Sequence, residues 1–254
     1  MTAPRGDQAL GSASKVEAVL FDVDGTLVDS NDAHAQAWSD AFKEVGREIG
    51  SETVLPLVGM GSDKLLPHLT GIDAESEEGK RLTERRTEIF MKVYLPAIRP
   101  FPEARELVER CRSAGLKPVV ASSASDDELQ GLMRVLGAEW LLDDATSSSD
   151  AERSKPDPDI VRAAVDKAGV GPAGCVMIGD TQYDVAAATR AGVRIIALRC
   201  GGRGDEDLKG AIAIYDDPAD LLAKVGESVL ADAMRPVGDR SRVARERERA
   251  SGRE

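Results

Sequence analysis

Two patterns of apolar and polar positions alternate along the chain. Short apolar runs bounded mostly by small or polar residues predict six strands, at 16–21, 116–121, 140–142, 175–178, 194–198 and 211–215. Most of the segments between them repeat their apolar residues at helical spacing. This alternation is typical of a parallel sheet with crossover helices, so we expect an α/β fold.

A large insertion separates the first predicted strand from the second. It is about ninety residues long, far more than one crossover helix needs. Its patterns are helical throughout: His34, Trp38 and Phe42 share one helical face, and a long charged stretch follows at 75–94. We expect an all-helical cap domain over 33–98, a discontinuous α/β core made of 16–32 and 99–231, and disordered tails at 1–15 and 232–254.

The composition indicates a globular protein that acts on small molecules. Hydrophobic residues make up 42% and charged residues 31% of the chain, and the net charge is −12. That charge repels polyanions, so no nucleic-acid partner is expected, and the arginines of the C-terminal segment are largely balanced by glutamates. No run of about 18 apolar residues exists, and the three cysteines lack metal-ligand spacing. We expect a cytoplasmic protein without a membrane partner, more readily a monomer than an oligomer.

The clearest chemical motif is FDVDGTLVDS at 21–30, directly after an apolar strand. Side chains two positions apart on an extended chain point the same way, so Asp22 and Asp24 are expected to project together. Gly25 then lets the chain turn away. At about 4 Å two such charges repel by roughly 4 kcal/mol at an effective dielectric constant of 20. The pair therefore needs a cation, a proton or both.

Other predicted strand ends supply complementary groups. Ser122 ends the second strand, Asp180 follows the fourth, and Asp184 lies one helical turn after Asp180. Lys155 precedes Pro156 and a predicted helix. Gathered at one edge of the sheet, the carboxylates suit Mg²⁺, and the lysine and the hydroxyl suit phosphate oxygens. Each group alone has an ordinary explanation as a turn, a solvated lysine or a helix cap. Their coincidence at one predicted edge of the sheet favours a catalytic site.

The sequence resembles the haloacid dehalogenase superfamily. The resemblance rests on four motifs in order: DVDGT at 22–26, the strand that ends in Ser122, Lys155 before Pro156, and GDTQYD at 179–184. It covers roughly residues 16–225 and implies a Rossmann-like parallel-sheet core. The insertion is similar to the helical cap of the phosphoglycolate phosphatase and beta-phosphoglucomutase branch.

The resemblance implies a magnesium-dependent phosphatase that hydrolyses a small phosphomonoester, such as a sugar phosphate or a phosphoglycolate-like ester. Asp22 would be the nucleophile that becomes an aspartyl-phosphate, and Asp24 the general acid and base. Asp22, Asp24 (through its backbone carbonyl) and Asp180 would hold Mg²⁺, with Asp184 just outside these ligands. The residues that would bind the substrate phosphate are Ser122, Ser123, Lys155 and Thr26.

Asp24 argues against dehalogenase and phosphonate chemistry, because the members with those activities lack this second aspartate. A phosphosugar mutase of the beta-phosphoglucomutase type is an alternative, because AHAQAW at 33–38 is similar to the mutase stretch that carries a cap histidine and tryptophan. Against it, Ser62 stands where the mutase has an arginine for the distal phosphate. His34 and Lys64 are the candidate cap residues for substrate.

A third alternative is a binding module that has lost catalysis, although the nucleophile, the second aspartate and the lysine are all present. The natural substrate cannot be read from the motifs. The loop 59–64 is expected to close over the leaving group and exclude water. Gly59 and Gly61 would permit its close approach to the core.

Overall fold

A six-stranded parallel sheet forms the centre of the molecule. The computed structural model describes residues 15–234, and the strand order is β3-β2-β1-β4-β5-β6 with all neighbours parallel. The strands are β1 (Ala18–Phe21), β2 (Lys117–Ala121), β3 (Ala145–Thr146), β4 (Cys175–Gly179), β5 (Arg194–Leu198) and β6 (Ala213–Tyr215). Every residue of β1 and β4 is buried, as expected for central strands covered on both faces.

Five of the six expected strands are confirmed, and the prediction at 140–142 is wrong. Those residues belong to a 3₁₀ helix, Glu139–Asp144, and the third strand is the pair Ala145–Thr146 that comes after it. Three apolar residues between acidic ones cannot be assigned to strand or helical turn by periodicity alone. Pairing with the end of β2 decides the position, and the Thr146 hydroxyl donates to the carbonyl of Val120 at 2.8 Å.

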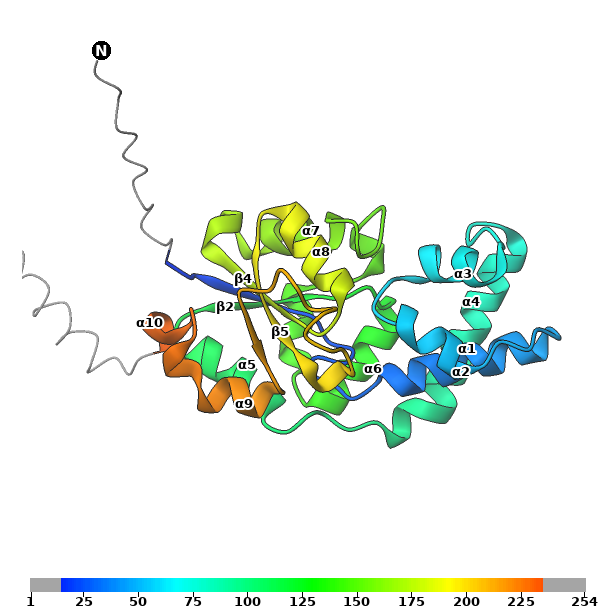
Figure 1. Cartoon of the computed structure of the whole chain (residues 1–254), viewed down its shortest axis with the longest axis horizontal. Coiled ribbons are helices and arrows are strands. Elements are labelled where there is room, and N and C mark those ends of the chain that lie inside the picture. The colour runs from blue at the N-terminus through cyan, green and yellow to red at the C-terminus, as the bar shows by residue number, and fades with distance from the viewer. Residues whose placement is uncertain (1–14, 235–254) are drawn as a thin grey trace, which may run out of the picture.

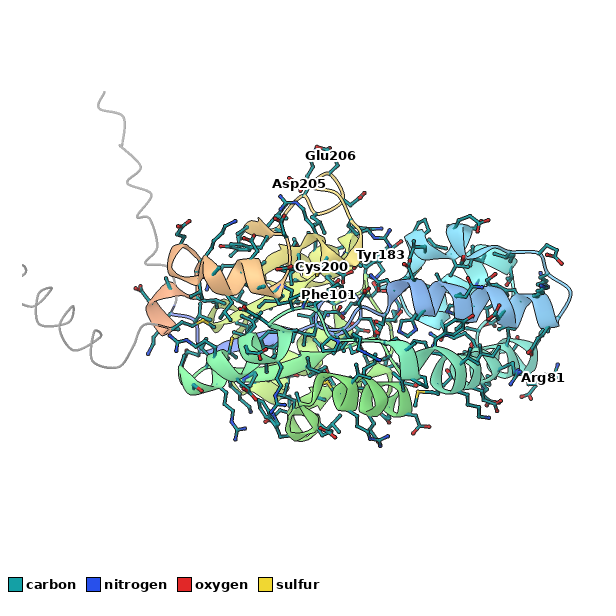
Figure 2. All side chains as sticks on the ribbon, turned by 90° about the horizontal axis from the view of Figure 1, so that it is seen from below. Arg81, Phe101, Tyr183, Cys200, Asp205 and Glu206 are labelled. Carbon is teal, nitrogen blue, oxygen red and sulfur yellow. The ribbon has the colours of Figure 1, made fainter. Side chains whose placement is uncertain are left out.

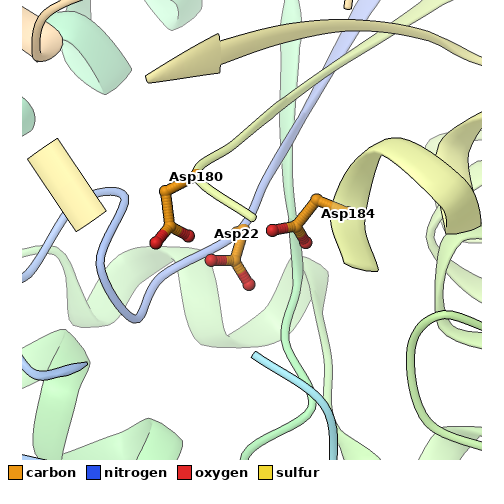
Figure 3. A group of neighbouring side chains, drawn as sticks. All are labelled: Asp22, Asp180 and Asp184. Carbon is orange, nitrogen blue, oxygen red and sulfur yellow. The ribbon is translucent and has the colours of Figure 1, made fainter. Parts of the chain in front are cut away.

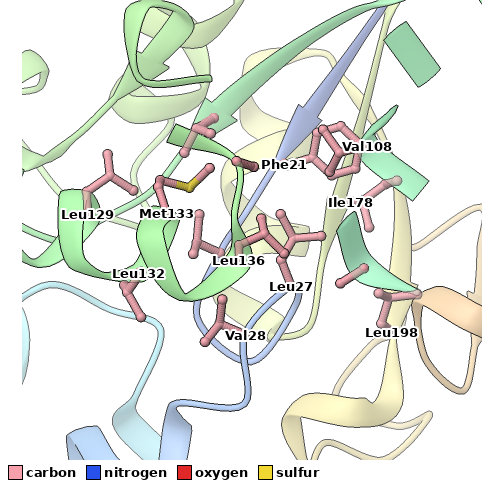
Figure 4. Close-up of a cluster of buried hydrophobic side chains, with 14 of the residues drawn as sticks. Phe21, Leu27, Val28, Val108, Leu129, Leu132, Met133, Leu136, Ile178 and Leu198 are labelled. Atoms are coloured by element: carbon pink, nitrogen blue, oxygen red, sulfur yellow. The ribbon is translucent and has the colours of Figure 1, made fainter. Parts of the chain in front are cut away.

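Helices cover both faces of the sheet (Figure 1). On one face lie α7 (Asp159–Ala168) and α8 (Gln182–Ala191), and on the other lie α5 (Ala104–Ser113), α6 (Asp126–Leu136) and α9 (Pro218–Ala223). Figure 4 shows α6 placing Leu129, Met133 and Leu136 among the same apolar cluster as Phe21 and Ile178 of the sheet. A capping box begins α6, since Ser125 and Glu128 satisfy each other's backbone groups.

The insertion between β1 and β2 is helical, and it lies beside one end of the sheet (Figure 1). Its elements are α1 (Asn31–Glu44), α2 (Ser51–Val54), η1 (Leu55–Leu57), α3 (Ser62–Thr70), α4 (Glu77–Ile89), η2 (Phe90–Tyr94) and η3 (Leu95–Ala97). The expected long helix at 75–94 is α4, which continues into the π-helical turn η2. The helix α1 starts at Asn31, two residues before the expected boundary, so its first turn stands next to the motif at 22–26.

Helix α10 (Ala231–Met234) corrects the expected C-terminal boundary, because Ala233 and Met234 are buried against the core. The rest of the two expected tails, 1–14 and 235–254, lies outside the described residues. The remaining short 3₁₀ helices are η5 (Ser148–Asp150), η6 (Pro172–Gly174), η7 (Arg199–Gly201) and η8 (Val225–Glu227). Among residues 15–234 no helix has the length and apolar character to cross a bilayer.

The strand order changes direction at β1, which pairs with β2 on one side and β4 on the other. In open α/β sheets such a switch point leaves a crevice at the carboxyl ends of the strands, where ligands bind. Asp22 continues β1 beyond its last residue and donates its backbone N–H to the carbonyl of Ile178 in β4 at 2.9 Å. The fold therefore brings the carboxyl ends of β1 and β4, with the polar residues directly after them, into one place.

Candidate active site

Three buried carboxylates meet at the switch point (Figure 3). Asp22 follows β1, Asp180 follows β4, and Asp184 lies in the first turn of α8, with one carboxylate oxygen from each within 4.8 Å of the others. Thr181 holds Asp184 in place through a capping box. Asp180 and Asp184 were expected at one edge with Asp22 and are found there, and Asp184 joins the cluster itself rather than standing outside it.

Burial disfavours the ionised forms of these carboxylates. Burial raises the pKa of Asp22 to about 7, against the lowering effect of Lys155, and the charges of Asp184 and Asp24 raise it further. Burial and the charges of Asp22 and Asp184 raise the pKa of Asp180 well above its usual value. Carboxylates so close together take up protons or a positive ion.

Lys155 supplies part of that positive charge. Its ammonium lies 2.5 Å from Oδ1 of Asp22 and 2.8 Å from Oδ1 of Asp184, and the side chain is 1% exposed. Burial lowers the pKa of Lys155, but the charges of Asp184 and Asp22 and their hydrogen bonds outweigh burial and raise it. One ammonium against three carboxylates leaves a net charge of −2 when all are ionised. A hard, oxygen-lined cluster with that excess charge fits Mg²⁺.

Thr26 and Asn31 orient the carboxylates. The Thr26 hydroxyl lies 3.0 Å from Oδ2 of Asp22 and 3.0 Å from Oδ1 of Asp180, so the structure places it among the carboxylates. Asn31 donates to Oδ2 of Asp180 at 2.9 Å and to the carbonyl of Gly201 at 3.0 Å. The sequence analysis missed Asn31; its signal was a polar residue directly after the motif, two residues before the predicted helical insertion.

Gly25 turns the chain where the motif predicted a turn. Its φ is +73°, a left-handed conformation that favours glycine, and a Cβ there would collide with Asn31 and Asp180 side-chain atoms. Asp24 is not one of the three clustered carboxylates, but it lines the same cavity as Asp22, and its charge contributes to the raised pKa of Asp22.

Asp24 faces the inserted helices. Its Oδ1 accepts a hydrogen bond from the Ser30 hydroxyl at 2.5 Å and lies 2.7 Å from Nε2 of His34. The His34 ring stacks on Phe90, with ring centroids 4.0 Å apart. Burial raises the pKa of Asp24, but the His34 charge and hydrogen bond, with the Ser30 hydrogen bond and Arg86, lower it below its usual value. His34, a candidate cap residue, thus contacts the second aspartate directly.

The two serines after β2 differ in exposure to the cavity. Ser122 is 1% exposed, and its hydroxyl accepts the backbone N–H of Ala124 at 3.0 Å. The hydroxyl of Ser123 is buried without a hydrogen-bond partner, and Ser123 lines the cavity beside Asp22 and Asp24. Of the two, Ser123 has the free hydroxyl.

The cavity lies between the core and the inserted helices and has a volume of about 350 Å³. The core contributes Asp22, Asp24 and Ser123, and the insertion contributes Trp38 and Arg86. A volume of this size accommodates a small metabolite. The expected loop 59–64 forms part of its wall.

That loop packs tightly on the core. The backbone N–H of Gly61 donates to the Ser154 hydroxyl at 3.0 Å, and a Cβ on Gly61 would lie 2.5 Å from Cβ of Ser154. A Cβ on Gly59 would lie 2.7 Å from Cγ2 of Thr181. The close approach that the two glycines were expected to permit is confirmed.

Lys64 serves this contact, since it bonds the carbonyl of Ser154 and lies 2.6 Å from Oδ2 of Asp157. It is not among the residues that line the cavity. Lys64 is therefore engaged with the core rather than aimed at a ligand.

Tyr183 makes a further contact between the core and the insertion. Its hydroxyl donates to the carbonyl of Pro56 at 3.0 Å where the two parts meet (Figure 2).

Arg86 and Glu128 were not found by the sequence analysis. Arg86 of α4 pairs with Glu128 of α6 across the cavity wall, and its guanidinium carbon lies 5.1 Å from the centre of the Trp38 ring. The two residues are 42 positions apart, and charged residues are frequent in both helices. No local pattern distinguishes this pair, so only the tertiary structure could reveal it.

Comparison with known proteins identifies the family. The sequence pattern of the haloacid dehalogenase-like hydrolases matches residues 16–192. An Arabidopsis thaliana protein, SUPPRESSOR OF QUENCHING 1, chloroplastic, is 36% identical over 200 residues, which are 77% of this chain but only 19% of the plant protein. A phosphoglycolate phosphatase of Rhodospirillum rubrum is 28% identical over 214 residues, covering 81% of this chain and 89% of that protein.

A solved structure agrees with this assignment. A hydrolase from Pseudomonas syringae superposes with a TM-score of 0.78 at 29% identity, covering 83% of this chain and 98% of that one. The shared architecture includes the parallel sheet whose switch point holds the cluster. The chain therefore belongs to the haloacid dehalogenase-like hydrolase family.

Proposed function

We propose that this protein is a magnesium-dependent phosphatase that hydrolyses a small phosphomonoester, a sugar phosphate or a phosphoglycolate-like ester, through an aspartyl-phosphate on Asp22. The observation that carries the proposal is the buried arrangement of Asp22, Asp180, Asp184 and Lys155, in which Asp22 also lines a cavity of metabolite size. Family membership supports the chemistry, and the name of the R. rubrum relative supports a small phosphomonoester as the substrate.

Asp22 is the nucleophile in this proposal. One of its carboxylate oxygens attacks the substrate phosphorus, the bond from phosphorus to the ester oxygen breaks, and the leaving oxygen takes a proton from Asp24. In the second half, Asp24 accepts a proton from a water molecule, whose oxygen attacks the phosphorus and releases Asp22. Inorganic phosphate and the free alcohol are the products.

To donate a proton to the leaving oxygen, Asp24 must first be protonated, because its lowered pKa favours the carboxylate form. His34 and Ser30 hold the carboxylate of Asp24 at the cavity wall, oriented for proton transfer. As a base toward water, Asp24 is already in the right protonation state. As an acid toward the leaving oxygen, it needs protonation once substrate is bound.

The residues that would hold Mg²⁺ are Asp22, Asp180 and the backbone carbonyl of Asp24, with Asp184 close by. The bound ion would neutralise negative charge on the phosphoryl oxygens and on the carboxylates. Lys155 would bind the same phosphoryl oxygens, and its ammonium bridges Asp22 and Asp184. The Ser123 hydroxyl, which lacks a protein partner, would donate to a phosphate oxygen, with Ser122 shaping the turn.

Phosphate release from a panel of small phosphomonoesters, including sugar phosphates and phosphoglycolate, tests the proposal. The wild type is expected to release phosphate only with Mg²⁺, and Asp22→Asn is expected to reduce release by at least about a thousandfold, the loss typical of a missing nucleophile. Asp29→Asn, a change outside the cluster in the same motif, is the matched control.

Two other outcomes would contradict the proposal. If no ester is hydrolysed but beta-glucose 1-phosphate is isomerised with a bisphosphate primer, the protein is a phosphosugar mutase. If neither reaction occurs, and phosphate or metal still binds, the protein is a binding module. The engagement of Lys64 with Asp157 rather than with the cavity disfavours the mutase, since no cation of this loop remains for a second phosphate.

A further inference from the structure

The lining of the cavity, apart from Asp22 and Asp24, carries more negative than positive charge. Among the cavity-lining residues within 15–234, Arg86 is the one with a permanent positive charge. The carboxylates on the lining other than Asp22 and Asp24 are Asp63, Glu75, Glu128 and Glu152. The region that would receive the leaving group is therefore acidic.

Glu128 already neutralises Arg86. The side chain of Glu128 is 4% exposed and pairs directly with the Arg86 guanidinium, whose side chain is 12% exposed. The contact is a single hydrogen bond from Nη1 of Arg86 to Oε1 of Glu128, and Nε of Arg86 is buried without a partner. Because the pair is largely buried, solvent screens its charges weakly. A second anionic group on the substrate would have to compete with Glu128 for the guanidinium.

Hydroxyl groups supply most of the remaining polar lining. They come from both sides of the cavity, on Ser62, Thr83, Thr87, Ser125 and Ser148. Hydroxyls both donate and accept hydrogen bonds, so they suit the alcohol groups of a sugar or polyol. They offer no net charge to offset a carboxylate or a second phosphate.

We infer that the substrate is a monophosphate whose leaving group is neutral and polyhydroxylated, and that the Arg86–Glu128 pair excludes substrates with a second anionic group. This inference rests on the proposed phosphatase function and narrows it. Sugar or polyol monophosphates are substrates, whereas bisphosphates and carboxylate-bearing esters such as phosphoglycolate are discriminated against.

Matched substrate pairs test the inference. Fructose 1-phosphate is compared with fructose 1,6-bisphosphate, and 2-hydroxyethyl phosphate with 2-phosphoglycolate, so that each pair differs in one anionic group. In the wild type, kcat/KM from phosphate release is expected to favour the neutral member by at least about tenfold, which corresponds to ~1.4 kcal/mol. Equal or higher kcat/KM for the anionic members would overturn the inference.

Glu128→Gln tests the role of the pair. Glutamine keeps a capping side chain toward Ser125 but frees the charge of Arg86. The preference for neutral substrates is expected to fall about tenfold, mainly through a higher kcat/KM for the anionic members. Adding Arg86→Gln to this variant should remove that gain, and an unchanged preference in Glu128→Gln would overturn the role of the pair.

Asp127→Asn is the matched control, because it removes one negative charge from the same turn of α6 at an exposed position that does not line the cavity. Its preference should equal that of the wild type. Failure of the phosphatase proposal gives a different result, since no member of either pair would then release phosphate. That result would overturn this inference as well.

Discussion

At the scale of single residues, Thr26 has an unexpected position. Its one hydroxyl lies between Asp22 and Asp180, 3.0 Å from an oxygen of each, and the residue is fully buried. The hydroxyl hydrogen can serve only one carboxylate at a time. Thr26 therefore sets the spacing of two proposed metal ligands more directly than it could bind the substrate phosphate.

Thr26→Val keeps the shape of the side chain and removes the hydroxyl. Hydrogen bonds to charged groups contribute ~1.5–3 kcal/mol, so we expect turnover to fall about tenfold and half-saturation with Mg²⁺ to require a higher concentration. Phosphate release measured across a magnesium titration checks both effects. Thr189→Val, exposed on α8, is the control, and a magnesium dependence like that of the wild type would argue against this role of Thr26.

At the scale of elements, the loop between η1 and α3 packs the insertion against the core. Gly61 precedes α3 with φ −74°, a value that proline also adopts, so Gly61→Pro leaves the backbone unstrained at that residue. The substitution removes the N–H that donates to Ser154 and adds atoms where the two residues almost touch. Gly61→Pro therefore tests the contact with Ser154 without changing the backbone conformation at residue 61.

We expect Gly61→Pro to lower kcat/KM about tenfold, because the loop would no longer close on the core at Ser154, while the melting temperature changes by only a few degrees. Steady-state kinetics and thermal unfolding check the two parts. Gly171→Pro is the control, since Gly171 has φ −69° and no atom near the position of a Cβ. Kinetics like those of the wild type in Gly61→Pro would refute the role of the loop.

At the scale of the whole molecule, charged contacts hold the insertion against the core. Lys64 lies 2.6 Å from Asp157, and the hydrogen bond from Lys64 lowers the pKa of Asp157 below its usual value, against the raising effect of burial. A carboxyl group whose pKa is lowered by folding stabilises the protein above its unfolded-state pKa. That contribution is lost as the pH falls through the lower, folded-state pKa.

Lys64→Met is expected to reduce the free energy of unfolding by ~0.5–1 kcal/mol at pH 7, because the pair is partly exposed. The difference from the wild type should persist down to about pH 4, the usual pKa of aspartate, and shrink below it. Urea unfolding at several pH values measures it. Lys80→Met, the control, removes a more exposed pair with Glu75 and should reduce the free energy of unfolding by less. If the effect of Lys64→Met did not depend on pH, the stabilising role of the Lys64–Asp157 pair would be contradicted.

Much of the core was predictable because its signals are local. Apolar runs indicated five strands correctly, and the polar residues after them placed Asp22, Asp180 and Asp184 at one edge, since parallel strands end on the same side. The strand at 140–142 failed because a three-residue apolar run has no clear period. The division into core and cap domains remains a prediction, as do the roles of the site residues.

Patterns among neighbouring residues were enough to specify the α/β class, the long helical insertion and the carboxylates and lysine of the cluster, because periodicity and strand-end chemistry are local properties. Which groups touch depended on the folded molecule. Folding turned Asp24 toward His34, placed Thr26 between two carboxylates and engaged Lys64 with Asp157. Folding also paired Arg86 of the insertion with Glu128 of the core. Such contacts join segments far apart in the chain, and their geometry depends on how the insertion packs against the core.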